Sequence, residues 1–412
     1  MGVDSKMAWR NLWRHPRRSL LTMAAIAFAC LLLIFMLSWQ FGSYDTMINA
    51  AVKIHTGHLQ VQAKGYHKKK NIRMVVADPD AVGTLLHNMP GVAAYTFRAN
   101  AFSLVSSADR TYGVVVVGID PEREAQVSTL KSLIREGAYL SGGDTNQALV
   151  GRLLAKNLQV RLGDELVALG QGRDGSVAAT VVKVKGIYGS GQDDFDRSSI
   201  QVPLTFFQDI YAMKDSVHEV VVLGKSLDDV STIKKAITTG IDTIGRRDHL
   251  IVFDWIELMP GLIEAIQMDL YSGFIFYIIL IIVVAFSILN TFLMAVFERT
   301  KEFGVLMAIG TTPGRLTNLL LLESMTMTLL GIAGGIILGI ALTWYFQVHG
   351  IVIAGTADLM RQYGMPEKMF PQLSLKSVLI GPAIVFIIAF LTALYPAVRV
   401  RRFKPVEAIG TG

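Results

Sequence analysis

Residues 271–297 read YSGFIFYIILIIVVAFSILNTFLMAVF, and no residue in this stretch carries a charge. An α-helix needs about 20 mostly apolar residues to cross the hydrocarbon core of a membrane. Three further stretches meet this requirement: 20–41, 316–346 and 378–398. Only 17% of the 412 residues are charged, against roughly 25% in soluble domains. The sequence therefore predicts a membrane protein with four spanning helices.

The segments between these stretches differ in charge. Basic residues outnumber acidic ones in 1–19, 298–315 and 399–412, and cytoplasmic segments of membrane proteins carry such an excess. We therefore expect these three segments inside the cell, and 42–270 and 347–377 outside it. The same bias accounts for the net charge of +6 without a nucleic-acid partner. The basic residues concerned are Lys6, Arg10, Arg14, Arg17, Arg18, Arg299, Lys301, Arg315, Arg399, Arg401, Arg402 and Lys404.

The first apolar stretch, 20–41, has two interpretations: a cleaved signal peptide or a retained helix. The apolar core of a signal peptide is about 7–15 residues long and is followed by a small-x-small cleavage site. This stretch is longer, and no such site follows it, so we expect a retained helix. The single cysteine, Cys30, lies within it, and no internal disulfide is expected.

The large external segment, 42–270, shows a mixture of strand and helix patterns. Alternating or β-branched runs predict strands at 58–62, 102–105, 112–118, 165–169, 177–185, 200–203, 219–223 and 250–253. Helical spacing predicts helices at 79–89, 147–157, 205–213 and 227–241. The segment is therefore expected to fold as an α/β domain.

No set of residues in this segment points to catalysis or to a metal. His55, His58 and His67 lack the i, i+4 spacing of a helical metal site, and we interpret them as ordinary surface or strand residues. The aspartates at 193, 194 and 196 lack the remainder of a calcium loop and predict a solvated loop. The sequence contains no G-x-x-x-x-G-K-[ST] phosphate loop. We assign no catalytic residue, and expect ATP on another subunit.

The junction between the second and third stretches, residues 298–316, reads ERTKEFGVLMAIGTTPGRL. In a short helix, Phe303, Leu306, Met307 and Gly310 would form one apolar face, with charged residues on the remainder. Such a helix can dock into a groove on a soluble partner, or it can lie passively at the membrane surface. The charged residues of this helix are Arg299, Lys301 and Glu302.

The third stretch contains two features that predict contacts. Gly331, Gly335 and Gly339 recur every four residues, a spacing that lets another helix approach closely. Packing within the chain and packing between two copies both fit this pattern, and we favour the first. Glu323 is costly in lipid without a partner, and a Lys or Arg of the junction is the candidate.

Three separated segments together resemble the FtsX/MacB/LolC-LolE superfamily of ABC permeases. The first is the junction itself, preceded by Asn290-Thr291 and followed by Leu322-Glu323. The second is the N-terminal WRNLWR of residues 9–14, followed by RRSLL at 17–21. The third is YPA at 395–397 with KPVEAI at 404–409. The resemblance extends over the whole chain.

The resemblance implies four transmembrane α-helices and a large extracytoplasmic α/β domain between the first and the second. Residues 1–19 would form an amphipathic cytoplasmic helix. The domain, 42–270, would divide into a porter part at 50–98 and 215–262 and a sabre part at 99–214. Residues 298–315 would form the helix that meets the ATPase. Its implied contact residues are Glu298, Arg299, Lys301, Glu302, Phe303, Gly304, Leu306, Met307 and Gly310.

The resemblance also implies partners. A permease of this type works in the bacterial inner membrane as a dimer, with a second copy or a paralogue, and with two copies of an ABC ATPase subunit that bind ATP and Mg. This chain would bind no cofactor itself. Movement driven by ATP would be transmitted to the external domain, which handles substrates from the outer leaflet or the periplasm.

Length and topology most resemble the lipoprotein-releasing LolC/LolE branch, whose partners are lipoproteins and a periplasmic lipoprotein carrier. In LolC a long hairpin hook recruits that carrier, whereas the corresponding turn here, 171–175, is short. An efflux or export permease and an FtsX-like regulator of cell-wall hydrolases are the alternatives, and a membrane-bound enzyme lacks a catalytic set. The candidate lining of a cargo cavity is Phe35, Trp39, Phe274 and Tyr277.

Overall fold

The computed structural model describes residues 3–243, 245, 249–352, 355 and 368–400. The chain divides into two compact units. The helical unit comprises Met1–Tyr44, Ala265–Val352 and Lys368–Gly412. The α/β unit comprises Asp45–Glu264 and Ile353–Glu367.

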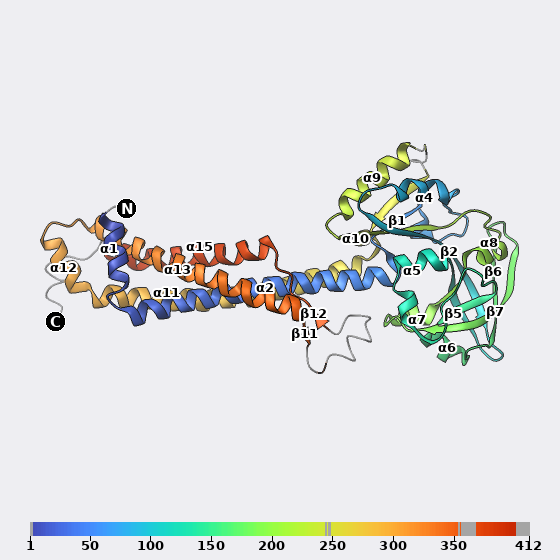
Figure 1. Cartoon of the computed structure of the whole chain (residues 1–412), viewed down its shortest axis with the longest axis horizontal. Coiled ribbons are helices and arrows are strands. Elements are labelled where there is room, and N and C mark those ends of the chain that lie inside the picture. The colour runs from blue at the N-terminus through green and yellow to red at the C-terminus, as the bar shows by residue number, and fades with distance from the viewer. Residues whose placement is uncertain (1–2, 244, 246–248, 353–354, 356–367, 401–412) are drawn as a thin grey trace. The chain divides into compact units, whose positions relative to one another are not determined.

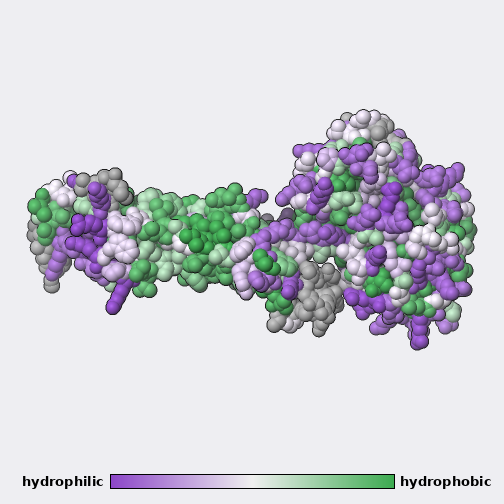
Figure 2. Space-filling model, viewed as in Figure 1, coloured by the Kyte–Doolittle hydropathy of each residue, from purple (hydrophilic) through white to green (hydrophobic). Residues whose placement is uncertain are grey.

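Four helices are long and apolar enough to cross a membrane, as the sequence predicts. They are α2 (Pro16–Ala51, continued by the π-helical turn η1, Val52–Thr56), α11 (Pro260–Glu298), α13 (Pro313–His349) and α15 (Leu375–Val400). Figure 2 shows a hydrophobic surface over the middle of the helical unit, and hydrophilic side chains at the end where Figure 1 places α1.

The expectation of one helix over 1–19 is wrong. Helix α1 spans Val3–Leu12, and α2 begins at Pro16. Proline lacks a backbone N–H and is favoured in the first turn of a helix, which agrees with the start of α2 at Pro16. The Ser19 hydroxyl donates to the Leu12 carbonyl oxygen at 2.8 Å and holds this corner.

The three spaced glycines of α13 contact α2 of the same chain. A Cβ added at Gly335 would lie 2.5 Å from the Cβ of Cys30, and one at Gly331 would lie 2.9 Å from the Cβ of Ile26. A Cβ at Gly339 would lie 3.1 Å from the Cδ1 of Ile34. The absence of side chains at these positions lets the two helices approach closely.

The α/β unit contains an open antiparallel sheet in the order β10-β1-β9-β2. Helices α4 and α9 pack against this sheet. The strands are β10 (Leu250–Asp254), β1 (Leu59–Ala63), β9 (Glu219–Gly224) and β2 (Val92–Ser106), and the helices are α4 (Pro79–His87), α9 (Val230–Thr243) and the short α10 (Trp255–Leu258).

Strand β2 continues beyond this sheet into a closed ring of six strands, which we call the barrel. Its order is β2-β3-β8-β5-β7-β6, with β6 pairing back to β2. The barrel interior is filled by small and β-branched side chains, among them Ala99, Val116 and Val182. The added elements are β3 (Thr111–Ile119), β4 (Ile134–Gly137, paired with β7), β5 (Gln147–Gly151), β6 (Glu165–Gln171), β7 (Val177–Tyr188), β8 (Ser199–Pro203), α3 (Tyr66–Lys69), α5 (Pro121–Val127), η2 (Leu130–Leu133), α6 (Arg152–Leu158), α7 (Asp193–Ser198) and α8 (Leu204–Ile210).

Arg98 lies where β2 changes partners from β9 to β3. Its side chain is fully buried and makes two hydrogen bonds to the Glu124 carboxylate, at 2.7 and 3.0 Å. A third N–H donates to the carbonyl oxygen of His55, in η1. A buried charge needs such compensation, so this pair ties η1, β2 and α5 together.

All eight predicted strands are confirmed. The predicted helix at 147–157 is wrong in its first half, because Gln147–Gly151 form strand β5 between β7 and β8. A short apolar run fits either a buried strand or a helix, and here the sheet neighbours decide it. The aspartates at 193–196 lie in helix α7, and Asp196 is buried, accepting from the Ser190 hydroxyl at 2.6 Å. The predicted solvated loop is therefore wrong.

Gly335→Ala should destabilise the helical unit, because the new Cβ would overlap Cys30 and force α2 and α13 apart, at a cost of about 1–3 kcal/mol. Gly334→Ala is the matched control, since its Cβ would meet only the Ala27 Cβ at 3.9 Å. The thermal unfolding midpoint of the purified chain in detergent should fall for the first variant and not for the second. Equal midpoints for the two variants would contradict this packing.

Candidate functional site

The junction between α11 and α13 contains one short helix, α12 (Thr300–Ala308), at the same end of the helical unit as α1. The expected helix over 298–315 is therefore shorter than predicted. Gly310 ends it in a left-handed conformation (φ +101°), which glycine adopts without strain. Helix α13 starts at Pro313, and the Thr312 side chain accepts from the Arg315 N–H.

Arg299 forms the central ion pair of the junction. It is 7% exposed, and its Nη1 lies 3.0 Å from Oε2 of Glu323 on α13, which is equally buried. Its Nε lies 3.2 Å from the Glu302 carboxylate, and its guanidinium lies over the Phe303 ring. The prediction that a basic residue of the junction partners Glu323 is confirmed. The expectation of Arg299 on the exposed face is wrong.

Two N-terminal arginines also contact the junction. Arg14 lies 3.6 Å from Glu302, and Arg18 is paired with Glu298 at the end of α11. These pairs are largely exposed, and such pairs contribute about 0–1 kcal/mol each. They nevertheless place the N-terminal residues beside α12.

The apolar face of α12 packs against neighbouring helices of the helical unit. This packing corrects the expectation that the apolar face docks into a partner. Phe303 is buried against Val296 and Leu316, and Leu306 and Met307 are half-buried in the same cluster. Gly304 is buried too, whereas Gly310 is exposed and lies beyond the helix end. These side chains hold α12 to its own neighbours.

A different stripe of α12 faces outward. Lys301 and Val305 on α12, and Ile309 directly after its last residue, recur every four residues and are exposed, Val305 at 51% and Ile309 at 76%. The Ile309 N–H still donates to the Val305 carbonyl oxygen, so the helical spacing extends to Ile309. Side chains four apart on a helix share one face. We call these three residues the outer stripe. The spacing is visible in the sequence, but Phe303, Leu306 and Met307 give an equally good helical pattern, and only packing decides which set is exposed.

The four residues proposed as a cargo cavity are not brought together around one pocket among the described residues. Phe35 packs edge-on against Phe346 of α13, while the Tyr277 hydroxyl donates to Gln40 of α2 at 2.8 Å. Trp39 is half-buried and Phe274 is exposed. An apolar groove with a volume of 590 Å³ lies between α11 and α15. Ile282, Phe286, Leu289, Leu293, Leu391 and Tyr395 line it.

The histidines near the start of the α/β unit have structural contacts. His58 is buried, and its Nδ1 accepts from the Gly224 N–H at 3.0 Å. Of the two expected roles, surface residue or strand residue, His58 fits the second, because it directly precedes β1 and its N–H donates to the Val222 carbonyl oxygen of β9. His67 packs against Phe253, and His55 against Phe195. Within the described ranges, no group of three His, Cys, Asp or Glu side chains is placed to hold a metal ion.

Two family models match the chain. The FtsX-like permease C-terminal model covers residues 274–405, and the MacB-like periplasmic core domain model covers residues 19–239. The second match alone extends over more than half of the chain.

Individual relatives agree with these models. The lipoprotein-releasing system transmembrane protein LolC of Xylella fastidiosa (strain 9a5c) is 23% identical over 316 residues, 73% of this chain and 74% of that protein. LolC of Neisseria meningitidis serogroup B is 23% identical over 335 residues, 78% of this chain and 79% of that protein. The macrolide export ATP-binding/permease protein MacB of Agrobacterium fabrum is 23% identical over 358 residues, 83% of this chain and 53% of that protein.

Glu323→Leu should destabilise the helical unit by up to about 3–5 kcal/mol, because it leaves the buried Arg299 with only the largely exposed Glu302 carboxylate as a counter-charge. The double variant Arg299→Met/Glu323→Leu should recover most of this loss. Arg14→Ala, which removes an exposed pair, should change stability by less than ~1 kcal/mol.

The measurement is the free energy of unfolding of the purified chain in detergent for all three variants. A double variant as unstable as the single one would show that the charge pair is not what holds the junction.

Proposed function

The chain belongs to the FtsX/MacB/LolC-LolE superfamily of ABC transporter permeases, and we propose that it transmits the work of a separate ATPase subunit to its α/β unit. The observation that carries this proposal is the junction. Helix α12 is fixed to α11 and α13 by the Arg299–Glu323 pair and by Phe303, while its outer stripe is exposed.

The outer stripe is the proposed contact with the ATPase. Val305 and Ile309 would enter an apolar groove of the partner, and Lys301 would meet an acidic residue at its edge. Because α12 is packed rigidly beneath this stripe, a displacement of α12 would displace the ends of α11 and α13. ATP and Mg would bind to the partner and not to this chain.

The proposed orientation follows the charge distribution. The basic N-terminal segment, the junction and the C-terminal segment would lie in the cytoplasm, with the α/β unit outside the inner membrane of a bacterium. Two permease chains and two ATPase subunits would form the complex. The second chain would be a further copy or a paralogue.

The proposed work is the release of lipoproteins from the inner membrane. Two relatives that this chain matches over about three quarters of its length are named for a lipoprotein-releasing system. A periplasmic lipoprotein carrier would be a further partner.

Two observations favour a second candidate, an export permease. The turn between β6 and β7 is confined to 172–176 and closed by a hydrogen bond from the Gly172 N–H to the Ser176 carbonyl oxygen. It offers no extended hook for a carrier. The MacB relative, named for macrolide export, matches a larger share of this chain than either LolC protein does.

Depletion of the chain from its host should leave newly made lipoproteins in the inner membrane. Wild-type chain should restore their transfer to the outer membrane, and Ile309→Asp at equal abundance should not, because a charge in the outer stripe opposes docking in an apolar groove. Leu375→Asp is the control, since Leu375 is as exposed as Ile309 but lies on another helix.

The measurement is the amount of pulse-labelled lipoprotein in separated membranes. Normal lipoprotein transfer in depleted cells, with increased sensitivity to exported compounds, would reject lipoprotein release and favour the export permease. Full restoration by Ile309→Asp would reject the outer stripe as the ATPase contact.

A further inference from the structure

The outside of the barrel carries an exposed apolar surface that crosses four adjacent strands. Phe102 on β2 is 71% exposed and lies opposite Val115 of β3, while Leu104 lies opposite Leu169 of β6. Val167 of β6 lies opposite a valine of β7. We call this surface the barrel stripe, and it consists of Phe102, Leu104, Val115, Val167, Leu169, Val177 and Val181.

The barrel stripe departs from the usual pattern of a half-buried sheet. Strand β6 and residues 177–184 of β7 alternate between buried or half-buried residues and exposed ones, and the buried set fills the barrel. The exposed set of such strands is normally polar. A contiguous exposed apolar surface of this kind marks a binding site.

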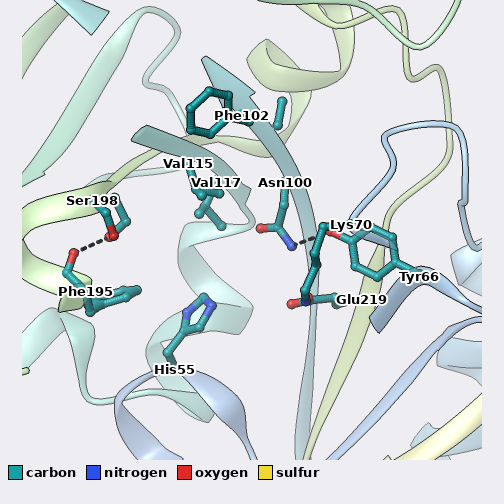
Figure 3. Close-up of a pocket in the computed structure, with 12 residues that line it drawn as sticks. His55, Tyr66, Lys70, Asn100, Phe102, Val115, Val117, Phe195, Ser198 and Glu219 are labelled. Atoms are coloured by element: carbon teal, nitrogen blue, oxygen red, sulfur yellow. Dashed lines mark hydrogen bonds and ion pairs between the residues drawn. The ribbon is translucent and has the colours of Figure 1, made fainter. Parts of the chain in front are cut away.

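A pocket of 340 Å³ adjoins the barrel stripe, at the position where β2 passes from the open sheet to the barrel. Phe102 and Val115 belong to both, so the pocket and the stripe are continuous. Figure 3 shows His55, Asn100 and Phe195 turned towards the space between them. Pockets of roughly 300–1,000 Å³ hold small ligands.

The wall of the pocket away from the stripe is polar. Two buried acceptor atoms, Oε2 of Glu219 and Oδ1 of Asn100, have no hydrogen-bond partner among the described residues. The Asn100 amide donates to the Tyr66 hydroxyl at 3.2 Å, which fixes its orientation. A buried polar atom without a hydrogen-bond partner destabilises the folded protein. A ligand that donates hydrogen bonds to these two oxygens would remove this destabilisation.

One flexible cation borders this wall. Lys70 is exposed, and its Nζ lies 3.5 Å from Oε1 of Glu219 and 4.9 Å over the Tyr66 ring. Burial lowers the pKa of His218, which stacks on Tyr66, to about 4, so His218 is neutral near pH 7. Lys70 is therefore the charged group available to a ligand's anion, and its movement would uncover Glu219.

We propose that the pocket and the barrel stripe bind an aminophospholipid such as phosphatidylethanolamine. The ammonium group donates to the Glu219 and Asn100 oxygens, the phosphate pairs with Lys70, and an acyl chain lies along the barrel stripe. The stripe crosses three interstrand spacings, or about 14 Å, which accommodates much of an acyl chain. The acceptor oxygens inside the pocket match the ammonium group of the headgroup, and the Lys70 cation at the rim matches its phosphate.

A lipid fits these observations better than a protein partner. A protein surface would cover the flat stripe but would not reach two acceptors inside an adjoining pocket. The helical unit also places this chain in a membrane, where such lipids are present at high concentration. The inference goes beyond the proposed coupling role and does not depend on the ATPase or on the cargo.

The test uses the full-length chain in detergent micelles, with a phosphatidylethanolamine probe that carries a photoactivatable group in its acyl chain. Peptides of β2, β3, β6 and β7 should be labelled, and a phosphatidylglycerol probe with the same acyl chain should label them less. Phe102→Glu should reduce this labelling roughly tenfold, the scale of placing an unpaired charge against an apolar chain. Labelling of α11 and α13 serves as the internal reference and should not change.

Two further variants separate the headgroup from the acyl chain. Glu219→Gln should remove the preference for phosphatidylethanolamine over phosphatidylglycerol. Leu162→Glu, an exposed position outside the stripe, is the control and should change neither the amount of barrel labelling nor this preference. Hydrogen exchange of β2 checks that each variant is folded. If Glu219→Gln does not fold, the labelling of Phe102→Glu decides the test. Barrel peptides that stay unlabelled, or that both probes label equally in the wild-type chain, would overturn the proposal and leave the stripe to a protein partner.

Discussion

The buried pair of Arg299 and Glu323 is the constraint on which the arrangement of the junction depends. It joins the residue that follows α11 to Glu323 on α13. The second counter-charge of Arg299, the Glu302 carboxylate, is largely exposed. Either charge alone would be costly to bury, so the two helix segments stay together. Phe303 packs beneath this pair, which fixes the rotation of α12 about its own axis. The outer stripe is exposed as a consequence.

The α/β unit has a related constraint. Strand β2 belongs both to the open sheet and to the barrel, and Arg98 lies where its partners change. The Arg98–Glu124 pair and the bond to His55 join that position to the helical turn η1. In both units a buried arginine therefore joins elements that are distant in sequence. Such joints suit a protein whose proposed role is to transmit movement.

The sequence predicted the elements better than it predicted their faces. Four spanning helices follow from length and hydropathy alone, and the partner of Glu323 follows from the cost of a carboxylate in lipid. The exposed face of α12 does not follow, because Phe303, Leu306 and Met307 fit a helical stripe as well as Lys301, Val305 and Ile309 do. The cargo cavity does not follow either, since aromatic residues near a membrane surface pack equally well against neighbouring helices. Gln147–Gly151 form a strand because they pair with β7 and β8, and these pairings are not visible in the local sequence.

The most direct test of the central claim is cross-linking between α12 and the ATPase subunit. With Cys30 replaced by Ala, single cysteines at Val305, Ile309 and Leu375 provide two positions in the outer stripe and one exposed position on α15. In the intact complex, a short bifunctional reagent should join the ATPase to the chain from Val305→Cys and Ile309→Cys, and not from Leu375→Cys. Cross-linking from Leu375→Cys alone, or from none of the three in a complex that hydrolyses ATP, would contradict the account.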